Sequence, residues 1–349
     1  LHGKVIGHPA WRDDQVVCYT AERAAIPTKS FFATEMNEEA QRGQENTMGI
    51  GKQEHWGEQL FEQAPILDLF VLHLGTSRIS RVENIPEDVT MEDPVFAPDG
   101  TSIVYTGWDA GLPRRLGRVY CQQRPSQLYS SPVTSLVESL SLPQSEEKDE
   151  TEATDSKYES LTSDYRLARS PRFAPTGTDD KTTLVFLGSA NGFDTHSGCM
   201  ALYGVDWETK EIRSVVKEVQ DPRDSSEDLG VVSGLTFPGL FMQSLPRQCF
   251  VSPTEMLVNS QWGSSSKVIH IDLDSCKASL FDCNCEEPSS QKLVCMNEKE
   301  QAIISTESST SPAELLQVSL GKDGKATKLY SFKSIASSLY SSLTVNEAT

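Results

Sequence analysis

The chain has 349 residues, of which 37% are hydrophobic and 23% charged, and its 50 acidic against 31 basic residues give a net charge of −19 at pH 7. This composition provides enough apolar material for a sizeable core, and it excludes wholesale disorder. The negative charge repels phosphate backbones and anionic lipid headgroups, so neither nucleic acid nor a membrane is expected as a partner.

No apolar run reaches the roughly 18 residues that a membrane span requires, and the best one, 66–74, contains Asp68 and His73. We therefore expect a soluble protein. The first ten residues show no basic stretch followed by an apolar one, as a secretory signal would. A start at Leu1 rather than Met indicates a segment of a longer protein.

The eight cysteines are too few for a dense disulfide framework in a chain of this length. Cys18 and Cys199 lie within apolar, strand-like runs. We expect reduced, mostly buried thiols and a cytoplasmic location.

A weak internal repeat is the most informative feature of the sequence. Each copy begins with a proline, an aromatic residue and a turn, and continues into a short β-branched or aromatic run. In chain order the copies run from Pro9 to Tyr19, from Pro94 to Tyr105 and from Pro171 to Phe186, with a fourth, from Cys249 to Val258, that lacks the proline in register.

A second hairpin follows in the repeats, as two alternating strands around a polar turn. In chain order these pairs are 66–74 with 78–82, 200–207 with 211–216, and 267–273 with 277–281, followed by a fifth unit at 301–304, 314–320 and 325–330. Four short antiparallel strands describe a propeller blade, which stacks on its neighbours because it cannot bury both faces alone.

We therefore predict an all-β fold, a β-propeller with about five recognisable four-stranded blades. The expected blades lie at about 1–90, 91–169, 170–235, 236–290 and 291–335.

The first repeats are spaced more widely than the ~40 to 50 residues of a plain blade, so insertions are expected. One lies between Pro27 and Gln63. The other, 130–164, contains the acidic run 145–152 and almost no apolar residue after Leu142. Such a composition cannot offset the entropy of ordering, so we predict a disordered acidic insertion. It is either a phosphorylatable or partner-binding segment or, more simply, an expanded surface loop.

Common catalytic signatures are absent from the sequence. It contains no G-x-S-x-G elbow, no dinucleotide or phosphate-binding glycine motif and no H-E-x-x-H zinc motif. Cys276, Cys283, Cys285 and Cys295 lack the paired spacing of a tetrahedral zinc site. No metal or cofactor is expected, and His270, between two isoleucines on a predicted strand, is interpreted as a surface histidine.

Two acidic segments are candidate binding elements. Glu38 and Glu39 could form the glutamate pair by which some propeller-capped peptidases hold a free amino terminus, but exposed loop acids are the simpler interpretation. The segment from Glu54 to Glu58 combines Trp56, a glycine and a carboxylate within a polar connection. Packing of Trp56 against a blade is its simpler interpretation.

Several stretches of the sequence resemble a known family. The stretches similar to the propeller of acylaminoacyl-peptidase, also called acylamino-acid-releasing enzyme, are Trp56 to Glu58, Pro65 to Leu74, Val82 to Glu87, Phe96 to Pro98, Gly107 to Trp108, Arg115 to Gly117 and Cys121 to Tyr129. Further similarity lies upstream at Trp11, 19–22 and 30–32, and downstream at Ser170 to Pro171, Tyr203 to Trp207 and Leu245 to Cys249. The similarity departs at 130–164 and thins after about Cys283.

The resemblance implies a cytosolic serine exopeptidase of the prolyl oligopeptidase class that releases an N-acylated residue from a blocked peptide. In that family the catalytic Ser, Asp and His lie in a C-terminal α/β-hydrolase domain, which this chain lacks, so no catalytic residue is assigned here. The propeller covers the active site and admits only short peptides. Candidate substrate-gate residues are Trp56, Glu58 and Arg115, and the implied partners are the hydrolase domain and short N-acylated peptides.

Two other functions remain open. A free-standing propeller that binds protein partners is the first alternative, although no repeat shows the G-H to W-D spacing of that class. A dipeptidyl-peptidase-like propeller is the second, and it would be a secreted or membrane-anchored protein with disulfides. Five units are fewer than the seven that the resemblance implies, so we expect an incomplete ring whose open edges favour a homo-oligomer.

Overall fold

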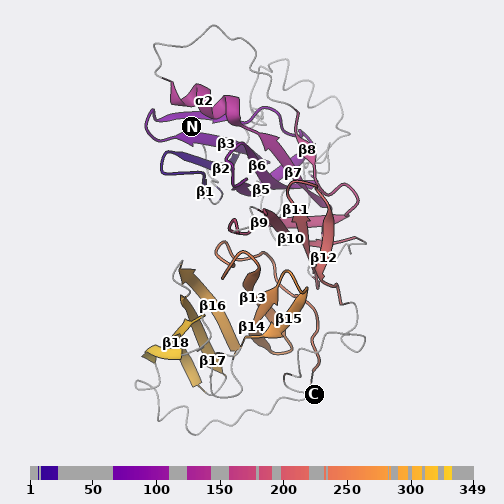
Figure 1. The fold of residues 1–349 in the computed structure, drawn as a ribbon, viewed down its shortest axis with the longest axis vertical. Helices are drawn as coiled ribbons and strands as arrows, with labels where there is room; N and C mark the ends of the chain where they lie inside the picture. Colours follow the sequence, from indigo (N-terminus) through magenta and orange to yellow (C-terminus); the bar gives the residue numbers. More distant parts are fainter. Residues whose placement is uncertain are drawn as a thin grey trace, which may run out of the picture. The chain divides into compact units, whose positions relative to one another are not determined.

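A computed structural model describes residues 7, 9–22, 66–109, 124–142, 157–177, 181–190, 198–219, 232, 235–281, 283, 290–297, 301–308, 311–320 and 326–331. The chain divides into two compact units, one of residues 1–169 with 192–196, the other of residues 170–191 with 197–349. Each unit is built from antiparallel sheets of short strands (Figure 1).

The first sheet of unit one is a four-stranded meander in the order β1-β2-β3-β4. Its strands are β1 (Ala10–Trp11), β2 (Val16–Glu22), β3 (Leu67–His73) and β4 (Arg78–Arg81). Almost every side chain of β2 is buried, because this central strand is covered on both faces. The ion pair of Arg81 with the buried Asp68, 2.7 Å from Nε to Oδ2, joins the outer strand β4 to β3.

A second sheet follows in the same unit. Its strands are β5 (Val89–Phe96), β6 (Ser102–Asp109), β7 (Ser126–Pro132) and the short β8 (Glu159–Ser160), paired in that order. The central strand β6 is buried from Ile103 to Trp108. One hydrophobic core joins the two sheets, with Val71, Met91, Ile103 and Tyr105 among its fully buried members.

Helix α2 (Thr134–Ser141) interrupts the second sheet between β7 and β8. Its apolar residues recur at helical spacing, and Val137 and Leu140 are buried in the core of unit one. The helix packs against β3 and β4, so it joins the second sheet to the first (Figure 1).

The predicted disordered insertion at 130–164 is therefore wrong at both of its ends. Residues 130–132 complete β7, 134–141 form α2, and 159–160 form β8. Apolar residues before the acidic run, from Val133 to Leu140, supply the buried face that the ordering of this part requires. The acidic run itself lies outside the described residues.

The second sheet continues through β9 (Leu167–Phe173), β10 (Thr183–Ser189), β11 (Ala201–Asp206) and β12 (Ile212–Val216), in that order. Its two halves are joined by one parallel pair, Ser126 of β7 with Leu167 of β9. Strand β9 begins in the first unit and ends in the second. The strand β10 is buried from Leu184 to Ser189, which matches its continuous apolar sequence.

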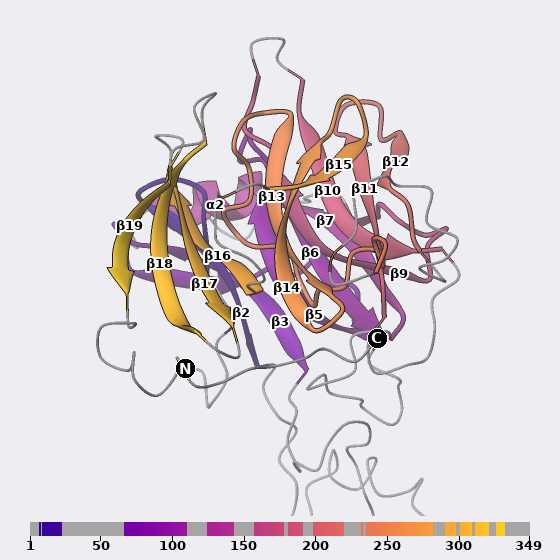
Figure 2. The same cartoon turned by 90° about the horizontal axis from the view of Figure 1, so that it is seen from below.

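The rest of unit two holds two more sheets. One is three-stranded, of β13 (Glu255–Trp262), β14 (Ser265–Asp272) and β15 (Lys277–Leu280). The other is four-stranded, of β16 (Ser290–Asn297), β17 (Gln301–Ser308), β18 (Ser311–Ser319) and β19 (Ala326–Ser331), and Figure 2 shows these strands side by side. A shared core that includes Leu257, Val268, Leu293 and Ile304 packs the two sheets together.

The all-β class is confirmed, and the sheets are the short antiparallel meanders from which a propeller is built. Second hairpins predicted at 66–82, 200–216 and 267–281 are present as β3–β4, β11–β12 and β14–β15. Within the part of the chain that the structure describes, no helix is long and apolar enough to cross a membrane. The predicted blade boundaries stay a prediction.

Candidate functional site

The three residues predicted to gate substrate, Trp56, Glu58 and Arg115, lie outside the described residues. The same holds for Glu38 and Glu39. Their role therefore stays a prediction. Among the described residues, the candidate site consists of the turns and first strands of the sheets.

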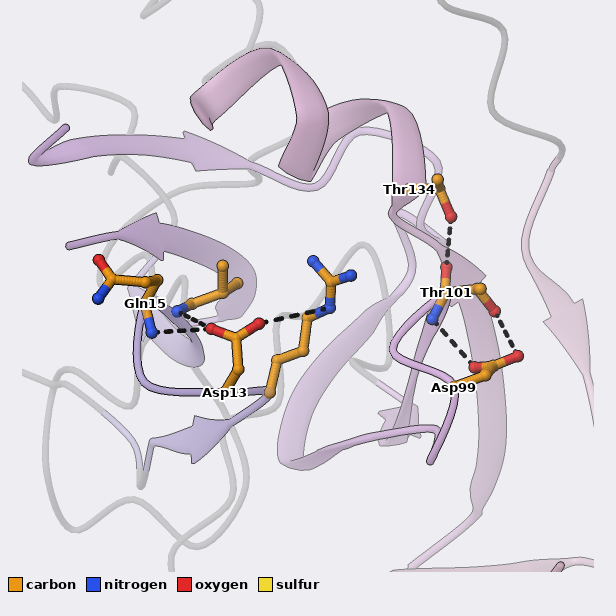
Figure 3. Close-up of polar contacts among 7 residues, drawn as sticks. Asp13, Gln15, Asp99, Thr101 and Thr134 are labelled. Carbon is orange, nitrogen blue, oxygen red and sulfur yellow. Dashed lines mark hydrogen bonds and ion pairs between the residues drawn. The ribbon is translucent and has the colours of Figure 1, made fainter. Parts of the chain in front are cut away.

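Two turns of unit one, at Asp13 and Asp99, are each held by an aspartate (Figure 3). The carboxylate of Asp13 accepts hydrogen bonds from the backbone N–H groups of Gln15 (2.8 Å) and Val16 (2.9 Å). Asp99 accepts from the N–H (3.0 Å) and the hydroxyl (2.9 Å) of Thr101. Such side-chain bonds satisfy turn N–H groups that no strand partner can reach.

The turn before β6 also requires a glycine. The Gly100 N–H donates to the carbonyl of Ala97 (2.8 Å), and Gly100 has a φ of 70°. A Cβ at this position would clash with Nε of Arg12. The side chain of Arg12, whose Nε is 3.8 Å from the carboxylate of Asp13, thus links the first turn to the second.

The first strands β5 and β9 share an unusual backbone. Asp93 and Ser170 both precede a proline, and both have positive φ, 55° and 60°. In β5 this position coincides with a shift in register between Glu92 and Val95. Left-handed φ is costly for residues other than glycine, and it persists only where the surroundings hold it. The repeated Pro-x-Phe-Ala-Pro motif thus marks a kink in each strand.

Around Ser170 the surroundings that hold the kink are visible. The N–H of Leu245 donates to Ser170 Oγ (2.9 Å). The buried guanidinium of Arg172 donates to the carbonyls of Leu245 (2.7 Å), Pro246 (3.0 Å) and Pro171 (2.7 Å). This arginine therefore fixes the irregular segment around Leu245 to β9 by backbone contacts.

Burial makes two of the described thiols poor nucleophiles. Cys18, Cys199, Cys249, Cys276 and Cys295 are not disulfide-bonded. Burial raises the pKa of Cys249 to about 12, although the nearby Arg172 lowers it, and burial also raises the pKa of Cys199. Since the thiolate is the nucleophile, the raised pKa values make these two cysteines less reactive than an exposed thiol.

One cysteine departs from the prediction of reduced thiols, because Cys283 is disulfide-bonded. The prediction of reduced thiols rests on the cysteine count and on the apolar runs around Cys18 and Cys199, and neither bears on Cys283. In the described part of the chain no group of His, Cys, Asp or Glu side chains could hold a metal ion.

The histidines do not form a nucleophile and base pair where they are described. His270 Nε2 lies 3.5 Å from a carboxylate oxygen of Glu255, on a face that solvent reaches. His73 Nδ1 lies 3.1 Å from the hydroxyl of Thr76, but that hydroxyl donates its proton to the carbonyl of Leu140 (2.7 Å). The described turns and strands thus form a hydrogen-bonded framework, and the described histidines form no nucleophile–base pair.

Comparison with known proteins identifies relatives of this framework. A sequence model described as the N-terminal domain of the acylamino-acid-releasing enzyme matches residues 7–345. Acylamino-acid-releasing enzyme 1 of Oryza sativa subsp. japonica is 26% identical over 285 residues, which cover 76% of this chain and 34% of the relative. The acylamino-acid-releasing enzyme of Mus musculus is 28% identical over 272 residues, 72% of this chain and 32% of the relative.

Solved structures show weaker likeness. TolB from Acinetobacter baumannii aligns with a TM-score of 0.42 at 12% identity, over 92% of this chain and 56% of that protein. Prolyl oligopeptidase B from Galerina marginata aligns with a TM-score of 0.49 at 8% identity, over 93% of this chain and 34% of that protein. The chain spans about a third of the length of the curated relatives that it matches.

Proposed function

The chain belongs to the family of N-terminal domains of acylamino-acid-releasing enzymes, and from this premise we propose that it controls the access of short N-acylated peptides to a serine-hydrolase active site. That active site would lie in a separate C-terminal domain of the full-length protein. The full-length protein would be a serine exopeptidase, an omega-peptidase that releases N-acyl amino acids.

The observation that carries this proposal is that the family model matches almost the whole chain, although the sequence has no serine-hydrolase motif. The match covers residues 7–345, yet the sequence contains no G-x-S-x-G elbow and aligns with only 34% of the rice relative. A peptidase needs a nucleophile, a base and an oxyanion hole. If the full-length protein hydrolyses peptides, those groups therefore come from outside this chain.

Steric selection is the contribution that the described residues support. Sheets with both faces of their central strands buried, and an arginine that fixes an irregular segment by two hydrogen bonds to its backbone, make a wall that deforms little. A rigid wall around an entrance excludes folded chains and admits short extended ones. Selection by size then needs no reactive side chain in the wall.

A cytoplasmic location is part of the proposal. Five of the described cysteines are not disulfide-bonded, as is usual in reducing compartments, whereas Cys283 is disulfide-bonded. The hydrolase domain and short N-acylated peptides are the proposed partners, and self-association of the chain is proposed because open sheet edges invite pairing. A sharp monodisperse monomer of the chain in light scattering would count against self-association.

The proposal is tested by the dependence of hydrolysis on peptide length. Full-length protein is given N-acetyl-alanyl peptides of increasing length, and kcat/KM is measured for each. We expect kcat/KM to fall steeply for long peptides. A short N-acetyl-alanyl chromogenic substrate, measured alongside, should not show this fall. Equal kcat/KM for short and long peptides would overturn the gating role.

Single variants then locate the gate. W56A, E58Q and R115A in the full-length protein are expected to relax the length dependence while activity on the chromogenic substrate persists. R124A is the matched control for R115A, since the guanidinium of Arg124 donates to the carbonyl of Asp109 (2.7 Å) and is not a predicted gate residue. If R115A and R124A give the same length profile as the unmodified protein, Arg115 is not a gate residue.

A further inference from the structure

Three hairpin turns in the chain share one design. They connect β3 to β4, β11 to β12, and β14 to β15. In the second, the carboxylate of Asp206 accepts from the N–H groups of Glu208 (3.1 Å) and Thr209 (3.0 Å). In the third, Asp272 accepts from the N–H groups of Asp274 (2.9 Å) and Ser275 (3.1 Å). A side-chain acceptor at the end of the first strand thus holds each of these turns.

Four residues after that acceptor, each of the three turns has a residue with positive φ. These residues are Ser77 (54°), Lys210 (63°) and Cys276 (53°). The shared backbone shows that the turns are structurally equivalent, although their sequences differ.

The turn between β3 and β4 has a histidine in place of the aspartate. The N–H of Thr76 donates to His73 Nδ1 (3.2 Å). Thr76 Oγ1 lies 3.1 Å from the same nitrogen, but its proton goes to the carbonyl of Leu140 (2.7 Å). The turn in this form therefore requires a neutral His73 that carries its proton on Nε2.

The same turn holds the end of helix α2. Thr76 donates to the Leu140 carbonyl, and the guanidinium of Arg78 donates to the carbonyls of Ser139 (2.9 Å) and Leu142 (3.3 Å). The last carbonyls of a helix have no partner within it, so these bonds cap α2 from outside. The helix has no basic residue in its last turn that could do this instead.

Protonation of His73 would remove the acceptor. A proton on Nδ1 cannot accept the Thr76 N–H, and it faces Thr76 Oγ1, to which it would donate instead. A positive charge would also stand directly opposite Arg78, the residue paired with His73 in the hairpin. Like charges directly opposite each other destabilise a strand pair.

Other charged residues lie on the elements packed around His73. They are Arg81 on β4, Glu138 on α2, Asp13 and Asp14 before β2, Glu22 on β2, Asp68 on β3, and Glu92 and Asp93 on β5. Of these, Asp13 accepts two turn N–H groups and Asp68 is paired with Arg81. Arg78 remains the charge placed directly across from His73.

We propose that the β3–β4 turn is a pH-sensitive latch that holds α2 on the first sheet when His73 is neutral and loosens it when His73 is protonated. Because α2 lies between β7 and β8 of the second sheet, the latch controls how firmly the two sheets of unit one are joined. Histidine is the side chain whose charge ordinarily changes between pH 5 and 8, and this sets the range in which the proposal is tested.

The test is hydrogen exchange of the full-length protein, read by mass spectrometry at about pH 5 and pH 8 and corrected for the intrinsic pH dependence of exchange. Peptides covering 67–81 and 133–142 are expected to lose protection at the lower pH by about threefold to tenfold, the ratio that one hydrogen bond is worth. Peptides covering 201–216, with the aspartate-held turn, are the internal control and are expected to show no such loss.

Two variants separate the latch from general acid weakening. H73D restores the acceptor found in the other two turns, so protection of 67–81 and 133–142 should become equal at the two pH values. T76V keeps the backbone N–H but removes the bond to Leu140, so α2 should be less protected than in the unmodified protein at both pH values. The proposal is overturned if the unmodified protein shows no loss in these peptides, or if H73D shows the same loss.

Discussion

The side chain of Asn259 makes an unusually direct link between two sheets of unit two. It extends from β13, and its Nδ2 donates to the carbonyl of Leu293 (3.2 Å) while its Oδ1 accepts the Leu293 N–H (2.7 Å). Strand β16 is the edge strand of its sheet, so Leu293 presents groups that no neighbouring strand of that sheet reaches. The amide therefore acts as one rung of a β-ladder.

Replacing Asn259 by alanine should cost about 2–4 kcal/mol of unfolding free energy. The change leaves a buried donor and a buried acceptor of Leu293 without this partner, and each such group costs about 1–3 kcal/mol. Some water reaching the strand edge reduces the sum. The assay is equilibrium urea unfolding of the 349-residue chain followed by tryptophan fluorescence, for which the fully buried Trp262 at the end of β13 is a nearby reporter.

Two further variants make the reasoning falsifiable. N259D keeps the acceptor but sets a carboxylate oxygen against the Leu293 carbonyl, so its deficit relative to the unmodified chain should shrink as acid protonates the carboxyl. N297A is the matched control, since Asn297 bonds Gln301 of β17 at the exposed end of β16. If N259A loses no more stability than N297A, the amide does not join the sheets.

Three other predictions concern the turns. G100A should cost about 1–3 kcal/mol of unfolding free energy in the same assay because of the positive φ and the approach of Arg12. G204A is the control: a Cβ there meets nothing closer than 3.4 Å and should cost less than about 1 kcal/mol. Equal losses of stability in the two variants would refute the strain argument. S77G should gain about 0.5–1 kcal/mol because glycine tolerates a φ of 54°, and a loss in thermal unfolding would contradict this. The Ser275 N–H bond lowers the pKa of Asp272, and the Thr209 N–H bond lowers that of Asp206. Each aspartate therefore contributes stability that is complete above the ordinary aspartate pKa and is lost as the pH falls through the lowered pKa. A double variant with asparagine at both positions should flatten the acid limb of a stability–pH curve, and an unchanged limb would count against the assignment.

Local patterns in the sequence predicted the hairpins well. The alternation from Lys267 to Leu273 and from Lys277 to Phe281 placed β14 and β15 within two residues, because register follows directly from which side chains must be buried. The proline motif likewise marked β5 and β9, but the positive φ just before each proline has no local signal that distinguishes it from an ordinary strand.

Long-range contacts were beyond the same reasoning. Helix α2 has apolar residues at helical spacing, yet the predicted disordered insertion at 130–164 includes it together with the acidic run that follows. The bonds of Asn259 to Leu293 and of Thr76 to Leu140 join residues 34 and 64 positions apart, and only the packed fold brings them together. The gate residues Trp56, Glu58 and Arg115 rest on family resemblance, because isolated polar loops carry no periodicity from which a site could be predicted.

The most direct test of the central claim is hydrolysis of a chromogenic N-acetyl-alanyl substrate by the 349-residue chain and by the full-length gene product, side by side. Activity in the full-length protein alone is the predicted result, because the sequence of this chain holds no serine-hydrolase elbow. Inactivity of both would favour a binding scaffold, and hydrolysis by the 349-residue chain would contradict the account.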